Sequence, residues 1–426
     1  MVFRKRYVIA AALVLAAAVI FWRQNPKQTG PVPQETIRPP SSVSEQADTK
    51  PEAPPKQAAQ PEPAPAAEPE PPKPTPPVRP AVRPTRLPNP PEIVKGVYFT
   101  MWSASLGSRI DYLLKLRNTT GLNTVVIDIK DYSGRIAYRA DIPEAKRCGA
   151  PRPVIRDIDG LVDRLHREGI YVIARLTVFQ DPVYAAARPE LAVHRKSLLG
   201  GEPKPALTRE TLWLDHKGLA WIDPAAREAW DYIAAIATEA ASHGFDELNF
   251  DYVRFPSDGD LKDMYFPHWD GKTPKREVLR AFFADLRKKL SGIPISADLF
   301  GLATVNSDDL GIGQIIEDSY AGFDYVCPMV YPSHYAKTFL GFANPAEHPY
   351  EVVNYSMQRA VDRLEALNLD GKVKLRPWLQ DFSLGAKYDS AMVKAQIQAV
   401  RDALGDRYAG YLLWSSSNRY TAEAVE

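Results

Sequence analysis

The stretch PAAREAWDYIAAIATEAASHGFDELNFDYVRFP, residues 224–256, contains the unit from which the fold can be predicted. Its first part, Pro224–His243, repeats apolar residues with the 3.6-residue period of an amphipathic helix. The next part, Phe245–Val253, alternates polar and apolar residues as a β-strand does. Gly244 lies between them, where a helix C-terminus often needs a residue in the left-handed conformation. The stretch therefore predicts a helix that passes through a short turn into a strand.

The same unit recurs on both sides of this stretch. The predicted strands are Ile93–Thr100, Asn123–Lys130, Ile170–Phe179, Phe245–Val253, Pro294–Phe300, Phe323–Tyr331, Val373–Gln380 and Gly410–Trp414. Helical periodicity lies between them, for example over Lys275–Leu290, Val352–Leu367 and Ala391–Leu404. The connections from helix to strand are short, whereas those from strand to helix include the long segments 180–223, 256–274 and 332–351. Eight units with long loops at one end predict an α/β fold, a (β/α)8 TIM barrel with its site in the loops after the strands.

An open doubly wound sheet is the competing fold. Its dinucleotide-binding form carries G-x-G-x-x-G after the first strand, where this chain has FTMWSASLG at residues 99–107. No Walker-type phosphate loop occurs in the chain either. The barrel is therefore the preferred prediction.

Side-chain alternation assigns polar residues to the interior of the predicted barrel. In Phe245–Val253 one face carries Glu247, Asn249 and Asp251, and the opposite face is apolar and suits packing against helices. The same parity places inside Asp128, Lys130, Arg175, Ser296, Asp298, Arg376, Trp378 and Gln380. Charged groups inside a barrel carry a desolvation cost unless they pair with one another or line a wet site.

The depth of each charged residue separates these two explanations. Deep pairs, such as Glu247 with Arg175 or Lys130, can be purely structural. Asp251 and Asp298 stand instead at the C-terminal ends of their strands, where a TIM barrel keeps its active site. We therefore expect the functional carboxylates at that end.

Aromatic residues lie near the same strand ends. They are Tyr98, Trp102, Tyr252, Tyr331, Tyr335, Trp378 and Trp414. An aromatic ring buries a large apolar face, and such a face suits the C–H groups of a sugar ring. Each ring taken alone is also explained by core packing. Gathered at one rim with two carboxylates, the rings favour a carbohydrate site.

Five segments carry a resemblance to a known family. They are KGVYFTMWSAS (95–105), FDELNFDYVRFPSDG (245–259), ISADLFG (295–301), YVCPMVYPSHY (325–335) and GYLLWSSSNRY (410–420). With them the chain resembles the bacterial "putative glycosyl hydrolase domain" family over most of residues 93–426. The resemblance implies a glycosidase barrel in which Asp251 is the catalytic carboxylate and Asp298 its partner acid. Many relatives of the wider group use Glu as the acid, so Glu317 and Asp318 stay open as alternatives.

Glycoside hydrolysis usually requires two carboxyl groups, and these two can meet its geometry. The groups lie about 5–5.5 Å apart in retaining enzymes and farther apart in inverting ones, and neighbouring strands are ~4.8 Å apart. Asp251 is then nucleophile or base, kept ionised by Arg254 or Arg175, and Asp298 is the proton donor in a drier pocket. The expected substrate-binding residues are Tyr98, Trp102, Asp128, Lys130, Arg175, Asn249, Arg254, Tyr331, Trp378, Gln380 and Trp414.

The amino terminus has the pattern of a membrane-targeting segment. Basic residues at positions 4–6 precede Tyr7–Trp22, an uncharged apolar run of 16 residues. Positive charge before such a run keeps the N-terminus in the cytoplasm and exports the rest of the chain. Because the run is shorter than the ~20 residues that span a bilayer untilted, residues 1–22 are predicted to be either a signal anchor or a cleaved signal peptide. Both place the protein in the cell envelope, with the barrel in the periplasm or outside the cell.

The next segment predicts a tether. Residues 26–91 contain 22 of the 39 prolines, and aromatic residues are almost absent there. Such a composition cannot bury enough apolar surface to offset its ordering entropy. We expect residues 23–91 to form a disordered Pro/Ala/Glu-rich linker and residues 92–426 to form the barrel.

Composition and spacing argue against several other classes of protein. With 53 basic and 52 acidic residues the net charge is +1, so no nucleic-acid partner is expected. Cys148 and Cys327 are too few for a disulfide framework. No two of the seven histidines lie within five residues of each other, which argues against a local metal-binding motif. No G-x-S-x-G elbow occurs, which argues against a serine hydrolase.

We therefore expect no metal, no cofactor and no protein partner, and a polysaccharide or oligosaccharide as substrate. The alternative to a hydrolase is a non-catalytic carbohydrate-binding or envelope scaffold protein that keeps the barrel.

Overall fold

The structure, a computed structural model, describes residues 85–201, 205–369 and 371–425. The predicted membrane segment 1–22 and nearly all of the predicted linker 23–91 lie outside these residues, so both stay predictions. In the part of the chain that is described, no helix has the length and apolar character needed to cross a bilayer.

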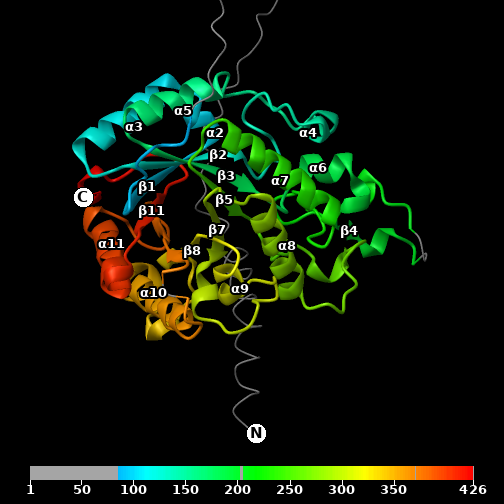
Figure 1. The fold of residues 1–426 in the computed structure, drawn as a ribbon. Helices are drawn as coiled ribbons and strands as arrows, with labels where there is room; N and C mark the ends of the chain where they lie inside the picture. The colour runs from blue at the N-terminus through cyan, green and yellow to red at the C-terminus, as the bar shows by residue number, and fades with distance from the viewer. Residues whose placement is uncertain (1–84, 202–204, 370, 426) are drawn as a thin grey trace, which may run out of the picture. The chain divides into compact units, whose positions relative to one another are not determined.

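The described residues form a closed barrel of eight parallel strand positions (Figure 1). The strands are β1 (Val94–Phe99), β2 (Thr124–Lys130), β3 (Tyr171–Thr177), β5 (Glu247–Asp251), β7 (Ile295–Phe300), β8 (Tyr325–Met329), β9 (Lys374–Leu375), β10 (Trp378–Gln380) and β11 (Gly410–Trp414). β9 and β10 share one position, which Pro377 interrupts because proline has no N–H for the ladder. β10 pairs with both β11 and β8 and so closes the barrel. The strands predicted from the sequence are confirmed in number and order.

A ring of helices surrounds the strands (Figure 1). The helices that connect successive strands are α3 (Gly107–Thr119), α5 (Ile158–Arg167), α7 (Arg227–Ser242), α8 (Lys275–Lys289), α9 (Ile316–Tyr320), α10 (Pro349–Glu365) and α11 (Ser390–Leu404). The eighth unit differs from the expectation, since the described residues after β11 form a 3-10 turn, Ala422–Ala424, in place of a helix. The Tyr420 hydroxyl instead accepts from the backbone N–H of Tyr98 in β1, at 3.0 Å.

Shorter elements shape the loops at the C-terminal end of the strands. They are α2 (Met101–Ala104), α4 (Pro143–Cys148), α6 (Pro182–Ala187), β4 (His194–Arg195) and β6 (Met264–Tyr265), with 3-10 turns that include Leu261–Asp263, Gly301–Thr304, Pro332–His334 and Phe339–Gly341. β4 pairs antiparallel with β6, so the loops after β3 and β5 are joined.

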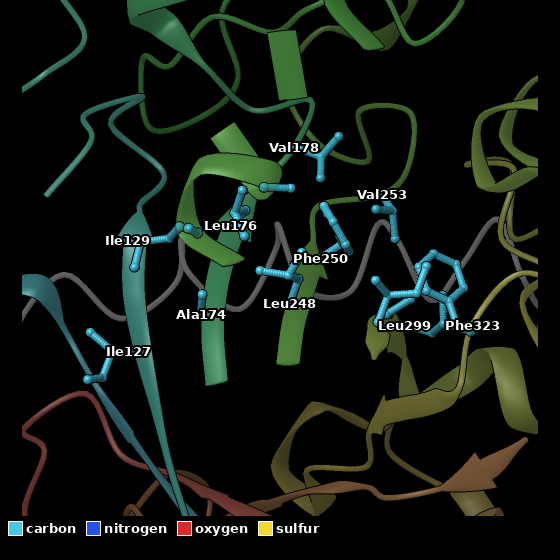
Figure 2. Packing of buried hydrophobic residues seen from close by; sticks show 14 of the residues in the cluster. Ile127, Ile129, Ala174, Leu176, Val178, Leu248, Phe250, Val253, Leu299 and Phe323 are labelled. Carbon is cyan, nitrogen blue, oxygen red and sulfur yellow. The ribbon is translucent and has the colours of Figure 1, made fainter. Parts of the chain in front are cut away.

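The two larger hydrophobic clusters of the described residues form the core around the strands. The larger lies between the strands and the helices, and Figure 2 shows Ile127, Leu176, Leu248 and Phe250 in it. The smaller lies on the opposite strand face, inside the barrel, and comprises Val94, Tyr98, Val126, Tyr171, Ile173, Cys327, Tyr331, Trp378 and Leu412. The predicted parity of β5 is therefore confirmed, and Gly244, with φ 88°, makes the predicted left-handed turn before it.

Candidate functional site

Four charged side chains meet inside the C-terminal end of the barrel, and we name them the rim cluster. Asp128 comes from β2, Arg175 from β3, Asp251 from β5 and Asp298 from β7. The Arg175 guanidinium donates to Asp128 through Nη1 and to Asp251 through Nη2, and its Nε lies 3.6 Å from Oδ2 of Asp298. Parallel register explains the meeting, because Asp128 lies beside Arg175 and Thr177 beside Asp251 on neighbouring strands. One cation therefore contacts three carboxyl groups.

Asp251 is the last residue of β5, and both of its partners donate to it. Besides Arg175, the backbone N–H of Tyr252 donates to Oδ1 of Asp251 at 2.5 Å. Tyr252 has φ 54°, a left-handed conformation that costs a residue other than glycine on the order of 1–3 kcal/mol. This turn ends the strand and points the N–H at the carboxylate. Arg175, and not Arg254, is thus the cation in contact with Asp251.

Asp298 is held in a different environment. Its Oδ1 accepts from Asn249 Nδ2 at 2.8 Å and from Trp378 Nε1 at 2.7 Å. Burial, with a further contribution from the charge of Asp251, raises the pKa of Asp298 to about 8, although Arg175, Asn249 and Trp378 act in the opposite direction. Because Oδ1 already serves two donors, Oδ2 is the oxygen that can carry a proton.

A cavity of about 790 Å3 opens at the rim cluster, and Asp251, Asp298 and Arg175 form part of its wall. This is within the range of small-molecule sites. Rings form another part of the wall, where Trp414 lies 5.2 Å from Phe382 and 6.1 Å from Tyr331 between ring centroids. The cavity therefore brings carboxyl groups and aromatic rings to one space, as a sugar would require.

The predicted site residues fall into three groups. Those that line the cavity are Asp251, Asp298, Arg175, Arg254, Tyr331, Trp378 and Trp414. Tyr98, Asp128 and Asn249 lie behind the wall and hold residues that line it. Tyr98 stacks on Trp414, with ring centroids 6.1 Å apart, and its hydroxyl donates to Asp128.

Lys130, Trp102 and Gln380 form the third group, which the structure does not bring to the cavity. The prediction that Lys130 points inward is wrong, because a β-bulge pairs Lys130 with Leu176 and re-aims its side chain. Its ammonium is buried and lies 2.9 Å from Asp181, which caps α6. Trp102 is 48% exposed and lies against Arg152, 4.9 Å from ring centroid to guanidinium carbon.

Gln380 has a supporting place at the rim. Its Oε1 accepts from the N–H of Ser333 at 3.2 Å, and its Nε2 donates to the carbonyl of Phe382 at 2.9 Å. Gln380 thereby joins the loop after β8 to the loop after β10, both of which line the cavity.

The alternative acids and the deep pair are also placed. Glu317 bonds Arg363, and Asp318 bonds Arg276, so both acids of α9 are engaged away from the cavity wall. Glu247 pairs with Arg376, which corrects the expected partners Arg175 and Lys130. Both side chains of this pair, which we name the basal pair, are fully buried.

Several cavity residues escaped the sequence analysis. They are Lys217, Ser257, Asp258, Phe300, Gly301, Leu302, Met329, His334, Phe382, Ser383, Leu384 and Ser416. Most come from the loops, where no periodicity indicates which way a side chain points. For Gly301 the sequence did offer a signal, because a glycine directly follows the predicted strand that becomes β7. The structure gives the reason for it: a Cβ at Gly301 would lie 2.5 Å from the carbonyl of Met329 and 2.7 Å from the Tyr335 hydroxyl.

A family model described as "Putative glycosyl hydrolase domain" matches residues 96–420, which is most of the chain. The chain belongs to this family. The resemblance inferred from the five segments is thus confirmed. No curated protein matches the chain by sequence.

The chain is also similar to solved structures, and the first of these shows the same kind of fold. The glycoside hydrolase domain of PgaB (BpsB) from Bordetella bronchiseptica is 16% identical, with a TM-score of 0.53 over 78% of this chain and 97% of that one. A hypothetical protein from Ruminiclostridium thermocellum is 33% identical over 50% of this chain and 98% of that one, with a TM-score of 0.42. An alpha-galactosidase from Thermus thermophilus, in complex with stachyose, is 14% identical over 80% of this chain and 65% of that one, with a TM-score of 0.45.

Proposed function

We propose that the barrel hydrolyses glycosidic bonds of a polysaccharide or oligosaccharide with Asp251 and Asp298 as its two carboxyl groups. The observation that carries this proposal is the unequal environment of two acids that share one guanidinium in a cavity wall. Asp251 is bonded by donors, whereas burial raises the pKa of Asp298 to about 8. A carboxyl group whose pKa is raised to near neutral pH, beside a second carboxyl group that accepts from a cation, is what an acid role beside a nucleophile or base requires.

In the proposed reaction the two acids take different roles. The proton on Asp298 passes to the glycosidic oxygen as its bond to the anomeric carbon breaks. In a retaining reaction Asp251 attacks that carbon, and a water molecule that gives a proton back to Asp298 then hydrolyses the covalent intermediate. In an inverting reaction Asp251 instead removes a proton from the attacking water. Trp414, Phe382 and Tyr331 provide apolar faces against which the sugar rings pack.

The test is hydrolysis of a panel of polysaccharides and aryl glycosides, with the anomer of the first product recorded. Asp251→Asn abolishes turnover in this proposal and leaves the fold intact. The matched control is Asp285→Asn on α8, which does not line the cavity and which we expect to keep full turnover. Binding of glycans without hydrolysis, equal in the parent and Asp251→Asn, would favour the non-catalytic alternative.

We also propose that the barrel works outside the cytoplasm, in the cell envelope. This rests on the basic leader and apolar run of residues 1–22. A topology reporter fused after residue 91 should be active only outside the cytoplasm, and a truncated chain starting at Glu92 should be soluble and folded. Reporter activity in the cytoplasm would contradict export.

A further inference from the structure

Arg254 is a buried cation in the cavity wall, three residues after Asp251. Its side chain is 6% exposed, and its guanidinium carbon lies 4.8 Å from the ring centroids of both Trp221 and Phe300 and 5.1 Å from that of Tyr252. Nη1 donates to the carbonyl of Phe255 at 3.1 Å, the one hydrogen bond that this side chain makes among the described residues. Most of its five N–H donors therefore have no hydrogen-bond partner within the described part of the chain.

No carboxylate of the described residues lies within ion-pair distance of Arg254. Asp251 is engaged by Arg175 and by the N–H of Tyr252. Asp215 accepts from the indole of Trp221 and from three further N–H groups. Asp258, the cavity-wall carboxylate that lies outside the rim cluster, accepts from the backbone N–H of His216 at 3.1 Å.

Burying the charge of Arg254 without an ion-pair partner among the described residues costs free energy. The same burial also changes the pKa of the guanidinium. Burial lowers the pKa of Arg254 below its usual value, despite the opposing charges of Asp251, Asp258 and Asp215. Arginine stays charged even so. A bound anion would supply the missing counter-charge and would gain charge-assisted hydrogen bonds to the guanidinium fork.

A second cation lies on the same wall. Lys217, on the loop between β3 and α7, is exposed and lines the cavity. Arg175 is already shared among three carboxyl groups, so it is not free to bind another anion. Beyond the rim cluster the wall therefore holds two cations, Arg254 and Lys217, against the single carboxylate of Asp258.

We propose that Arg254 and Lys217 form an anion-binding subsite and that the substrate is an acidic polysaccharide whose sugar residue presents an oxyanion there. The planar guanidinium suits the carboxylate of a uronic acid or a sulfate ester, which it binds through two parallel N–H donors. The claim that the ligand is a polysaccharide substrate rests on the proposed hydrolysis. The claim that the site binds an anion rests on the residues of the cavity wall alone.

The experiment compares matched acidic and neutral oligosaccharides. Uronate oligomers (glucuronate, galacturonate and mannuronate) are each paired with their carboxyl-reduced forms, and a sulfated oligomer is paired with its desulfated form. Dissociation constants are measured by calorimetry on the full chain carrying Asp251→Asn and on the parent. We expect at least one acidic form to bind on the order of 10- to 100-fold more tightly than its neutral partner, and the two arms separate carboxylate from sulfate.

Variants then assign the preference to residues. Arg254→Met keeps the apolar packing against the rings and should reduce the acidic preference to near unity. Arg254→Lys and Lys217→Met should reduce it in part, because a point charge or a single cation remains. The control is Lys262→Met, an exposed lysine of the loop after β5 that does not line the cavity, and it should leave the preference unchanged. Lys217→Met is an exposed change and tests the subsite even where Arg254→Met fails to fold.

The outcomes separate the two proposals. Binding or hydrolysis of neutral oligomers with no acidic preference overturns the anion subsite and leaves the hydrolase standing. An equal fall in kcat for acidic and neutral substrates in Arg254→Met also overturns it, since Arg254 would then act through Asp251. An Arg254-dependent preference without hydrolysis of any substrate supports the subsite and contradicts the hydrolase. Absence of binding to every acidic oligomer overturns the subsite.

Discussion

Two of the buried ionic groups in the barrel, the basal pair and the rim cluster, differ in access and in charge balance. The basal pair, Glu247 with Arg376, matches one anion with one cation, and both side chains are fully buried. The rim cluster matches Arg175 with three acids, and the Arg175 side chain keeps 12% exposure at a cavity wall. Carboxylate and guanidinium groups in the same barrel therefore form a sealed, charge-balanced pair in one place and an accessible cluster with excess acid in the other.

Charge balance explains why only one of the two groups suits acid chemistry. In the basal pair one cation balances one anion, and neither side chain is accessible to a substrate that could take up a proton. In the rim cluster burial of Asp298, the least exposed of the three carboxyl groups, raises its pKa to about 8, and the charge of nearby Asp251 adds to the shift because one guanidinium is shared among three acids. In the proposed reaction this carboxyl group is therefore the proton donor.

The two groups are also connected. The Ser296 hydroxyl donates to Glu247 at 2.6 Å, and Asn249 Nδ2 reaches both Ser296 at 3.0 Å and Asp298 at 2.8 Å. The basal pair therefore helps to fix Asn249, which in turn holds Asp298. Variants that separate stability from turnover show how far the two groups act independently.

The largest effect is expected at the rim. Asp251→Asn keeps the shape and removes the charge, so turnover should fall on the order of 10^4-fold, as it does when a nucleophile or base is lost. The thermal midpoint should stay within a few degrees of the parent. Normal turnover in Asp251→Asn, on a substrate that the parent hydrolyses, would end the assignment of this residue.

The basal pair should show the opposite pattern. Arg376→Met leaves Glu247 charged and buried without its partner, which costs about 3–5 kcal/mol of unfolding free energy. Adding Glu247→Leu removes the stranded charge and should recover much of this loss. Urea unfolding measures both variants. The double variant should retain measurable turnover per folded molecule. If it instead lost as much turnover as Asp251→Asn while keeping the stability of the parent, the two groups would not differ in the way described.

The fold was predictable because strand periodicity and helix-to-strand glycines are local signals. The parity of β5 placed Glu247, Asn249 and Asp251 on one inner face, as observed. The same parity failed at Lys130, where an unrecognised bulge in β2 inserts one extra residue. Parity identifies the face of a side chain and not its partner, so Glu247 was paired with the wrong cation.

The site was predictable only where it rests on strands. Asp251 and Asp298 were found from the strand ends, whereas His334, Phe382 and Lys217 come from loops whose paths depend on tertiary contacts. Gln380 illustrates the limit: its sequence position predicted a ligand contact, and its hydrogen bonds to the two loops became visible only in the folded chain.

The pH dependence offers a sharper view of the rim. Since Asp298 must be protonated to act as the acid, kcat/KM should fall as the pH rises through about 8. Asp298→Asn should lose this limb and should lose less turnover on substrates whose leaving group needs little protonation. A basic limb unchanged in Asp298→Asn on such a substrate would assign the proton donor elsewhere.

The same group affects stability in a defined direction. Its folded-state pKa lies above the usual aspartate value, so its contribution to stability is largest in acid and is lost as the pH rises through about 8. The thermal midpoint of Asp298→Asn should therefore fall less between pH 6 and pH 9 than that of the parent. A parallel decline in both proteins would show that Asp298 is not the buried acid.

Trp378→Phe should change this pKa without removing the acid. The indole N–H donates to Oδ1 of Asp298 and lowers its pKa, so its loss should move the basic limb to higher pH by about one unit at most, the shift that corresponds to one hydrogen bond. Leu379→Ile, on the opposite strand face, is the control and should leave the limb in place. A shift to lower pH in Trp378→Phe would contradict the hydrogen-bond account of Asp298.

The smallest effect is expected behind the cavity wall, at Tyr98. Its hydroxyl donates to Asp128, which in turn accepts from Arg175, so Tyr98 acts on the reacting carboxylates through two intermediates. Tyr98→Phe keeps the stacking on Trp414 and removes one hydrogen bond, which is worth about 1 kcal/mol. Turnover should fall less than 10-fold, with KM little changed, and the thermal midpoint should drop by about 1–2 °C. A loss as large as that of Asp251→Asn would mean that Tyr98 contacts the substrate itself and belongs to the cavity wall, not to the residues behind it.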